Sequence, residues 1–144
     1  MAYSPEIAEA ICERLGEGEP MRQICRLEGM PAWRTVYHWI EENPDFAARI
    51  AHARARGYDA IAEECLEIAD DRRYDTRLSG AGENEREVAN AEWIGRSKVR
   101  IETRLKLLAK WDPKRFGEKV EQTIQGPGGG AIEVITRRVV DPKA

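Results

Sequence analysis

The chain has 144 residues, of which 42% are hydrophobic and 34% charged, and its formal net charge is −3. It contains no run of eighteen apolar residues and begins with neither a basic nor an apolar segment, so we expect no membrane span and no signal peptide. Its three cysteines show no CxxC spacing, which favours reduced, buried thiols over a disulfide framework or a zinc site.

The N-terminal residues predict a first helix. Ser4 is a typical N-cap, Pro5 suits the first helical position, and Glu6 places an acid in the first turn. Apolar residues then recur every four positions, at Ile7, Ile11 and Leu15. This spacing predicts one buried stripe along the helix.

Residues 21–42 have the pattern of a helix-turn-helix. A second helix over about 21–28 would end at Gly29, which suits the left-handed position after a helix. A third helix would begin near Pro31. We expect its inward face to be formed by Ala32, Val36, Trp39 and Ile40. Arg34 and His38 would then point outward, and the N-terminal part of such a second helix is the part that contacts base edges in DNA-binding proteins.

The charge around this motif limits its affinity for DNA. Arg34 could pair with a guanine edge, and Arg22 and Arg26 could reach phosphates. Residues 1–44, however, contain four arginines, no lysine and eight acids. Because DNA affinity depends mainly on phosphate neutralisation, one copy should bind weakly, whereas several linked copies could bind usefully. A small helical bundle that contacts another protein is the alternative interpretation.

Two long helices are predicted in the middle of the chain. The first spans residues 44–71 and begins with the capping sequence Asn43-Pro44, and the second spans 88–111 and ends before Pro113. The polar stretch between them, RRYDTRLSGAGENERE, predicts a loop. Residues 59–92 hold 4 basic and 11 acidic side chains, whereas residues 93–120 hold 9 and 3. We therefore expect an antiparallel hairpin in which opposite charges flank an apolar seam.

The C-terminal tail changes its periodicity. KVEQTIQ alternates and AIEVITRRVV is β-branched, and GPGGG separates them, which predicts a β-hairpin. Because a lone hairpin is marginally stable, this one should pair with another surface. The glycine-rich loop lacks the Gly-Lys-Ser/Thr of a P-loop, so a flexible connection is the expected role.

Nothing in the sequence predicts an enzyme, a catalytic residue, a metal site or a cofactor. One acidic cluster resembles the carboxylates of a two-metal nuclease, but a solvated loop is the favoured interpretation because no rigid framework fixes its geometry. The cluster comprises Asp70, Asp71, Asp75, Glu83, Glu85 and Glu87. The two histidines, His38 and His52, have no serine or cysteine partner in a recognisable motif.

Three segments together resemble the small terminase subunits of tailed bacteriophages. They are ICERLGEGEPMRQICRLEGMPAWRTVYHWI, FAARIAHARARGYDAIAEECLEIADD and KVRIETRLKLLAKWDPKRFGEKV. The resemblance implies a mainly α fold with a DNA-binding helix-turn-helix module over 1–43, a helical-hairpin oligomerisation core over 44–113, and a C-terminal segment over 114–144. The last segment would form an inter-subunit β-barrel and dock the partner.

The resemblance also implies a function. The chain would recognise the packaging site on double-stranded viral DNA in the host cytoplasm, form a ring of roughly seven to ten copies, and recruit the large terminase subunit, which carries the ATPase and nuclease. A helix-turn-helix transcriptional regulator and an oligomeric scaffold that does not bind DNA are the two alternatives. A dimer would favour the regulator.

Two sets of functional residues follow from the pattern and the resemblance together. The expected DNA-binding residues are Arg22, Arg26, Trp33, Arg34, Thr35, Tyr37 and His38. The expected oligomerisation residues are Ile61, Leu66, Ile68, Ile94, Ile101, Leu105, Leu108, Val120, Ile124, Ile132 and Val134.

Overall fold

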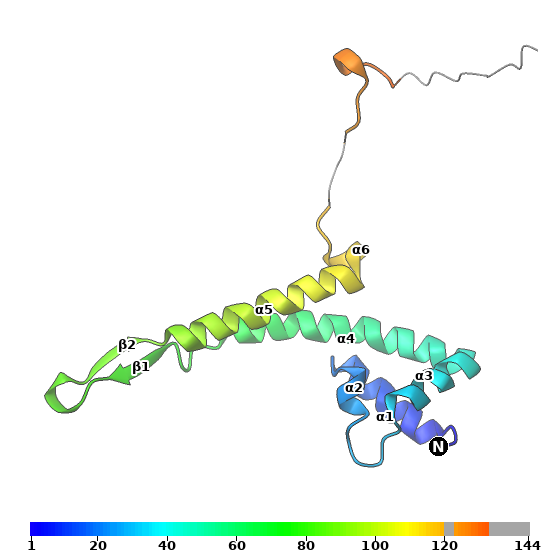
Figure 1. Cartoon of the computed structure of the whole chain (residues 1–144), viewed down its shortest axis with the longest axis horizontal. Helices are drawn as coiled ribbons and strands as arrows, with labels where there is room; N and C mark the ends of the chain where they lie inside the picture. Colours follow the sequence, from blue (N-terminus) through cyan, green and yellow to red (C-terminus); the bar gives the residue numbers. More distant parts are fainter. Residues whose placement is uncertain (120–122, 133–144) are drawn as a thin grey trace, which may run out of the picture.

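The computed structural model describes residues 1–119 and 123–132, and most of this part is helical (Figure 1). The mainly α class is as predicted. The elements follow in the order α1 (Pro5–Gly16), α2 (Met21–Ile24), α3 (Trp33–Glu42), α4 (Pro44–Asp70), β1 (Thr76–Ser79), η1 (Gly82–Asn84), β2 (Arg86–Ala89), α5 (Ala91–Trp111), α6 (Pro113–Phe116) and η2 (Pro127–Gly129).

Side-chain caps begin the longer helices. The backbone N–H of Ile7 donates to Ser4 Oγ at 3.3 Å, and that of Phe46 donates to Asn43 Oδ1 at 3.1 Å. Each cap satisfies a backbone donor that has no partner within its own helix. Proline follows both caps, so these two predicted helix starts are confirmed. Asn43 is also the only residue between α3 and α4, which makes the corner between them tight.

The region between α2 and α3 differs from the sequence prediction. α2 ends at Ile24 rather than near residue 28, because the chain continues in i→i+3 turns, as in Leu27 N–H to Ile24 carbonyl at 3.1 Å. These tighter turns leave Leu27 exposed. Gly29 has φ +79°, which is the left-handed conformation predicted for it. α3 begins at Trp33, and Ala32, expected on the inward face, is its exposed N-cap residue.

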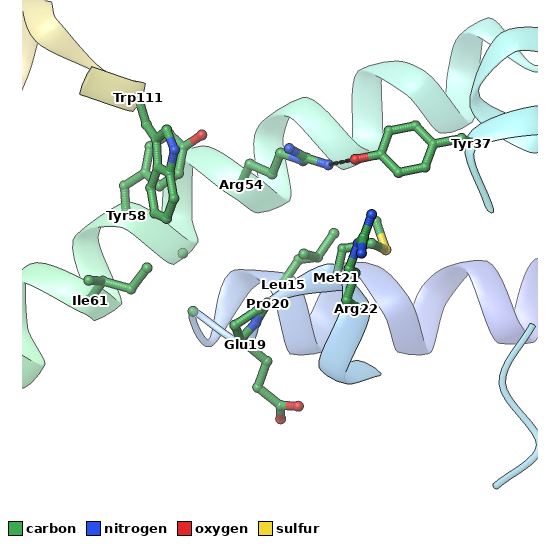
Figure 2. A pocket seen from close by; sticks show the side chains of 12 residues that line it. Leu15, Glu19, Pro20, Met21, Arg22, Tyr37, Arg54, Tyr58, Ile61 and Trp111 are labelled. Carbon is green, nitrogen blue, oxygen red and sulfur yellow. Dashed lines mark hydrogen bonds between the residues drawn. The ribbon is translucent and has the colours of Figure 1, made fainter. Parts of the chain in front are cut away.

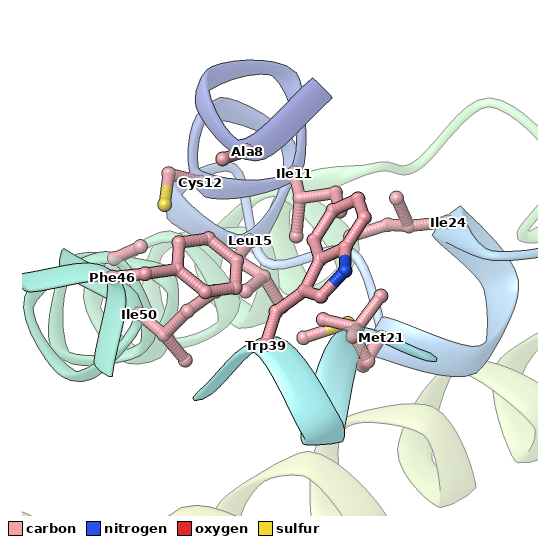
Figure 3. Packing of buried hydrophobic residues seen from close by; sticks show 11 residues of the cluster. Ala8, Ile11, Cys12, Leu15, Met21, Ile24, Trp39, Phe46 and Ile50 are labelled. Carbon is pink, nitrogen blue, oxygen red and sulfur yellow. The ribbon is translucent and has the colours of Figure 1, made fainter. Parts of the chain in front are cut away.

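One apolar core holds the N-terminal module together (Figure 3). α1 supplies a stripe that includes Ile11 and Leu15, and α3 supplies Val36 and Trp39. The first half of α4 completes this core with Phe46, Ile50 and Ala53. The N-terminal core therefore extends past residue 43, where the sequence suggested a domain boundary.

Gly57 lies where α4 crosses the end of α1. A Cβ atom at this position would stand 2.1 Å from the backbone oxygen of Leu15. No other residue type fits that distance without a shift of the backbone. Gly57 is therefore the point at which the N-terminal module packs closely against α4.

α4 and α5 form the predicted antiparallel helical hairpin (Figure 1). Leu108 of α5 is fully buried, and Cys65 and Ile68 of α4 are each 7% exposed. Arg104 makes a bidentate pair with Glu64, at 2.9 and 3.0 Å, and Arg100 lies 3.5 Å from the same carboxylate. These pairs fix the register of the two helices, because they join one acid on α4 to two successive turns of α5.

The base of the hairpin is closed by aromatic and ionic contacts. Tyr58 of α4 stacks on Trp111 at the end of α5, with ring centroids 5.7 Å apart. Arg115 of α6 reaches back to Asp59 of α4 at 2.8 Å. α6 therefore anchors the chain against α4 before the tail begins.

The predictions for residues 76–89 are wrong, because the expected loop and the first two residues of the helix expected over 88–111 form a two-stranded antiparallel sheet. α5 begins at Ala91 instead of residue 88. Thr76 pairs with Ala89 and Ser79 with Arg86. Gly80, at φ +102°, allows the chain to reverse between the strands. The strands are nearly all exposed, so the sequence carries no apolar alternation that would have revealed them. Figure 1 shows this hairpin extending beyond the end of α4.

The predicted C-terminal hairpin falls largely outside the described residues. Val120 and Val134 belong to the parts of the tail that are not described. Ile124 and Ile132 are exposed, and residues 123–132 contain the short η2 turn rather than a strand. The two-stranded sheet of this structure is thus β1–β2, and the tail barrel stays a prediction.

The three cysteines are free thiols, as expected. Cys12 and Cys65 are buried and Cys25 is half-buried, and burial raises the pKa of each thiol. Among the described helices, none has the length and apolar composition that crossing a membrane requires.

Candidate nucleic-acid interface

α3 presents its polar side to solvent because its apolar side is fixed in the core. Val36 and Trp39 are buried, whereas Arg34, Tyr37 and His38 are exposed on the opposite side. This division is the one predicted from the 3.6-residue period. Thr35 lies at the edge of the exposed face and is half-buried.

Trp33, at the first position of α3, brings two arginines together. The guanidinium carbon of Arg22 lies 4.6 Å from the Trp33 ring centroid, and that of Arg34 lies 5.3 Å from it. Both distances fall within the range of a cation–π contact. Tyr37 lies one turn later with its ring edge-on to Trp33 at 6.0 Å. An arginine from α2 and an arginine from α3 thus share one aromatic platform.

Charge changes sign along α3. Arg34 and the neighbouring Arg22 lie near its N-terminal end, where the helix dipole is also positive. Glu41 and Glu42 lie at its C-terminal end, and His38 Nε2 is 3.3 Å from the Glu42 carboxylate. A polyanion would therefore meet favourable charge at the beginning of α3 and unfavourable charge at its end.

Arg54 of α4 is a contact that the sequence did not predict. Its Nη2 donates to the Tyr37 hydroxyl at 3.4 Å, and its Nε is buried without a partner among the described residues (Figure 2). Nothing in the sequence links a residue of the long helix to one seventeen positions earlier. The contact fixes the outer face of α3 relative to α4.

A cavity of about 350 Å³ lies beside this contact (Figure 2). It opens where the N-terminal module, α4 and the end of α5 meet. Its walls are mainly apolar, and they are formed by Leu15, Gly18, Glu19, Pro20, Met21, Arg22, Tyr37, Arg54, Gly57, Tyr58, Ile61 and Trp111.

The predicted DNA-binding residues are thus only partly brought together. Arg22, Trp33, Arg34 and Tyr37 form one cluster. Arg26 is exposed in the turn after α2 and, in the described part of the chain, makes no ion pair or aromatic contact. His38 pairs with Glu42 instead, and Thr35 is half-buried at the edge of the exposed face.

The seven predicted oligomerisation residues of the helical hairpin fall into three groups. Ile68 and Leu108 are buried between α4 and α5 of the same chain. Ile61 and Ile101 are half-buried. Leu66, Ile94 and Leu105 are 66%, 46% and 48% exposed, which is unusual for side chains of this size. The exposed group is the one that remains available for contact with another chain.

The acidic cluster considered as a nuclease site is not assembled as one. The Asp71 carboxylate is hydrogen-bonded to Arg73, whose Nε and Nη2 donate at 2.8 and 2.7 Å. These bonds lower the pKa of Asp71 to about 2. Throughout residues 1–119 and 123–132, no group of three or more His, Cys, Asp or Glu side chains is arranged to hold a metal ion.

Comparison with known proteins now identifies the family. The family model described as "Bacteriophage Sf6, terminase small subunit-like" matches residues 3–123. A crystal structure of terminase small subunit gp1 of the bacterial virus Sf6, with an aspartate-to-arginine mutation, is similar with a TM-score of 0.69 and 32% identity over 94% of this chain and 98% of that one. Two further gp1 variants are 31% identical over 99% of this chain and 98% of theirs, with TM-scores of 0.68 and 0.69. No curated protein matches the sequence. The chain therefore belongs to the Sf6 terminase small subunit-like family.

Proposed function

We propose that this chain is the small terminase subunit of a phage and that it performs three tasks in packaging. It recognises a site on the viral DNA, it assembles into a closed ring, and it recruits the large terminase subunit. Membership of the family supports a role in DNA packaging inside the host cell. The three tasks are assigned to the three parts of the chain, and none of them requires catalysis by the chain itself.

The observation that carries the DNA-binding assignment is the cluster around Trp33. Two guanidinium groups from α2 and α3 lie near one half-buried aromatic ring, that of Trp33, at the N-terminal end of α3. Arginines in this position can contact phosphates or a guanine edge. The many acids of the module should keep binding by a single copy weak, so useful affinity depends on several copies acting together.

The exposed apolar side chains of the helical hairpin support assembly. Leu66, Ile94 and Leu105 together offer apolar area that a monomer would leave in water. Contacts between different faces of identical subunits either close into rings or continue as filaments. We therefore infer a closed ring, with roughly seven to ten copies as the resemblance to this family implies.

We assign the docking of the large terminase subunit to the C-terminal segment, residues 114–144. α6 anchors the start of the segment through Arg115, and Ile124 and Ile132 beyond it are exposed. Strands from several tails could pair edge to edge around a ring axis, since closure removes unpaired edges. The large terminase subunit would dock at this end.

Two measurements test the proposal. Native mass spectrometry gives the number of copies, and fluorescence anisotropy with tiled duplexes from the parent viral genome locates a preferred site. We expect a ring of uniform size and a steep loss of DNA affinity with added salt. A stable dimer that binds one operator-like site would instead favour a transcriptional regulator. A ring without measurable DNA binding would favour a scaffold.

A further inference from the structure

The second half of α4 has an acidic outer face. Glu63, Leu66, Glu67 and Asp70 follow the spacing that places residues on one side of a helix, and all four are exposed. Glu64 and Ile68, which pack toward α5, lie on the other side. None of the three outer acids makes an ion pair within the described part of the chain.

α5 has a basic outer face of the same kind. Arg96, Val99, Thr103, Lys106 and Lys110 recur at three- and four-residue intervals and are all exposed. Val99, in this row, is 53% exposed. Among the described residues, Arg96, Lys106 and Lys110 have no acidic partner, whereas the neighbouring Arg100 and Arg104 are engaged by Glu64. Each outer face thus combines unpaired charges of one sign with an exposed apolar side chain.

The intrachain register shows that the two faces match in position. Glu64 contacts Arg100 and Arg104, so residue 64 is level with about residue 102. In antiparallel helices a step forward along one is a step back along the other. Residues 63, 66 and 70 of α4 are therefore level with about 103, 100 and 96 of α5. Rotation about an axis parallel to the helices relates neighbouring copies without changing the height of any residue along that axis. In such a ring, Glu63 of one copy would lie beside Thr103 and Lys106 of the next. Leu66 would lie beside Val99, and Asp70 beside Arg96.

From this match we infer that the outer face of α4 in one subunit packs against the outer face of α5 in the next. The occupant of each face is a second copy of this chain, and the inference rests on the ring assembly proposed above. A contact between the α4 faces of two subunits would bring acidic side chains together, and a contact between their α5 faces would bring basic side chains together. Like-charge repulsion disfavours both contacts. Charge therefore excludes a symmetric dimer through either face and leaves the head-to-tail contact that closes a ring.

Charge reversal tests the pairing directly. The acid-face variant carries Glu63→Lys and Asp70→Lys, and the base-face variant carries Arg96→Glu and Lys106→Glu. Each should raise the concentration of half-assembly by about tenfold or more, because repulsion replaces attraction at every interface of the ring. The variant with all four substitutions should assemble again, since both signs are exchanged. An equal mixture of the two single-face variants should also assemble, in even-numbered rings with alternating subunits.

The readout is native mass spectrometry over a concentration series, with circular dichroism to confirm that each variant is folded. Glu13→Lys with Glu17→Lys is the matched control for the acid face, because it makes the same charge change on exposed residues in the last turn of α1 and at its C-cap. The control should assemble like the wild type. A folded four-substitution variant that stays unassembled, or single-face variants that assemble normally, would overturn the pairing while leaving the ring in place. A wild-type chain that is monomeric would overturn the ring itself.

Discussion

The backbone oxygen of Leu15, in the last turn of α1, lies against Gly57 in the middle of α4, where a Cβ atom would stand only 2.1 Å away. α4 also supplies Phe46, Ile50 and Ala53 to the N-terminal core, and its second half pairs with α5. One continuous helix therefore belongs to both the candidate DNA-binding module and the helical hairpin. The orientation of α3 relative to the hairpin depends on this helix and on the contact at Gly57.

Gly57→Ala should destabilise the protein. Alanine is favoured over glycine within a helix by about 1 kcal/mol, but here its methyl group would force α1 away from α4. Overpacking of this kind costs about 1–3 kcal/mol, and we expect a net loss because the atom it meets is backbone. Thermal unfolding followed by circular dichroism measures the change. Gly95→Ala in α5 is the control, since nothing lies within 4 Å of its Cβ position, and it should be neutral or stabilising. Equal melting temperatures for the two variants would contradict the close contact.

Arg34→Ala should weaken DNA binding without affecting the fold. The side chain is exposed and contacts the Trp33 ring, so its removal takes little from the core. Loss of one phosphate or base contact should reduce affinity by roughly tenfold, measured by fluorescence anisotropy at fixed salt. Arg72→Ala removes the same charge from an exposed position after α4 and should bind like the wild type. If both variants bind equally well, Arg34 is not part of the interface.

Deletion of residues 118–144 should leave an assembled protein. The described core of the N-terminal module and the α4–α5 seam lie within residues 1–117. The long helices also carry exposed apolar side chains that a neighbouring subunit can cover, among them Leu66, Ile94 and Leu105. If the tail docks the large terminase subunit, the truncated ring should fail to stimulate that subunit's ATPase. Native mass spectrometry and a coupled ATPase assay measure the two properties. A truncated chain that is monomeric would show that the tail drives assembly, and normal stimulation would place the docking surface elsewhere.

The Asp71 carboxyl group should have an unusually low pKa. It accepts hydrogen bonds from the side chain and the backbone N–H of Arg73, and these lower its pKa from 3.8 to about 2. Because the folded pKa lies below the unfolded one, the interaction stabilises the fold above about pH 4, and this contribution is lost as the pH falls toward 2. NMR detection of the Asp71 carboxyl carbon against pH gives the midpoint. Arg73→Ala should return the midpoint toward 3.8, whereas Arg72→Ala should leave it near 2.

The sequence alone determined where α1 and α4 begin, whereas α5 begins at Ala91 and not at the predicted residue 88. Ser4 and Asn43 cap helices whose first turns lie within four residues of the cap, so the decisive contacts are local and readable. The same holds for Gly29, whose left-handed conformation follows from having no Cβ. The inward position of Val36 and Trp39 followed from helical periodicity, and this in turn placed Arg34 and Tyr37 on the exposed side.

The tertiary structure decided those features that helical periodicity and helix-capping residues do not predict. The β1–β2 strands bury little, so no apolar alternation marks them, and pairing of their backbones after the turn at Gly80 is what forms them. The meeting of Arg22 with Trp33 and of Arg54 with Tyr37 depends on how α2 and α4 pack against α3. The contact of Gly57 with Leu15 likewise joins residues forty-two positions apart. Such pairings are set by the shape of the packed core, which a local pattern does not determine.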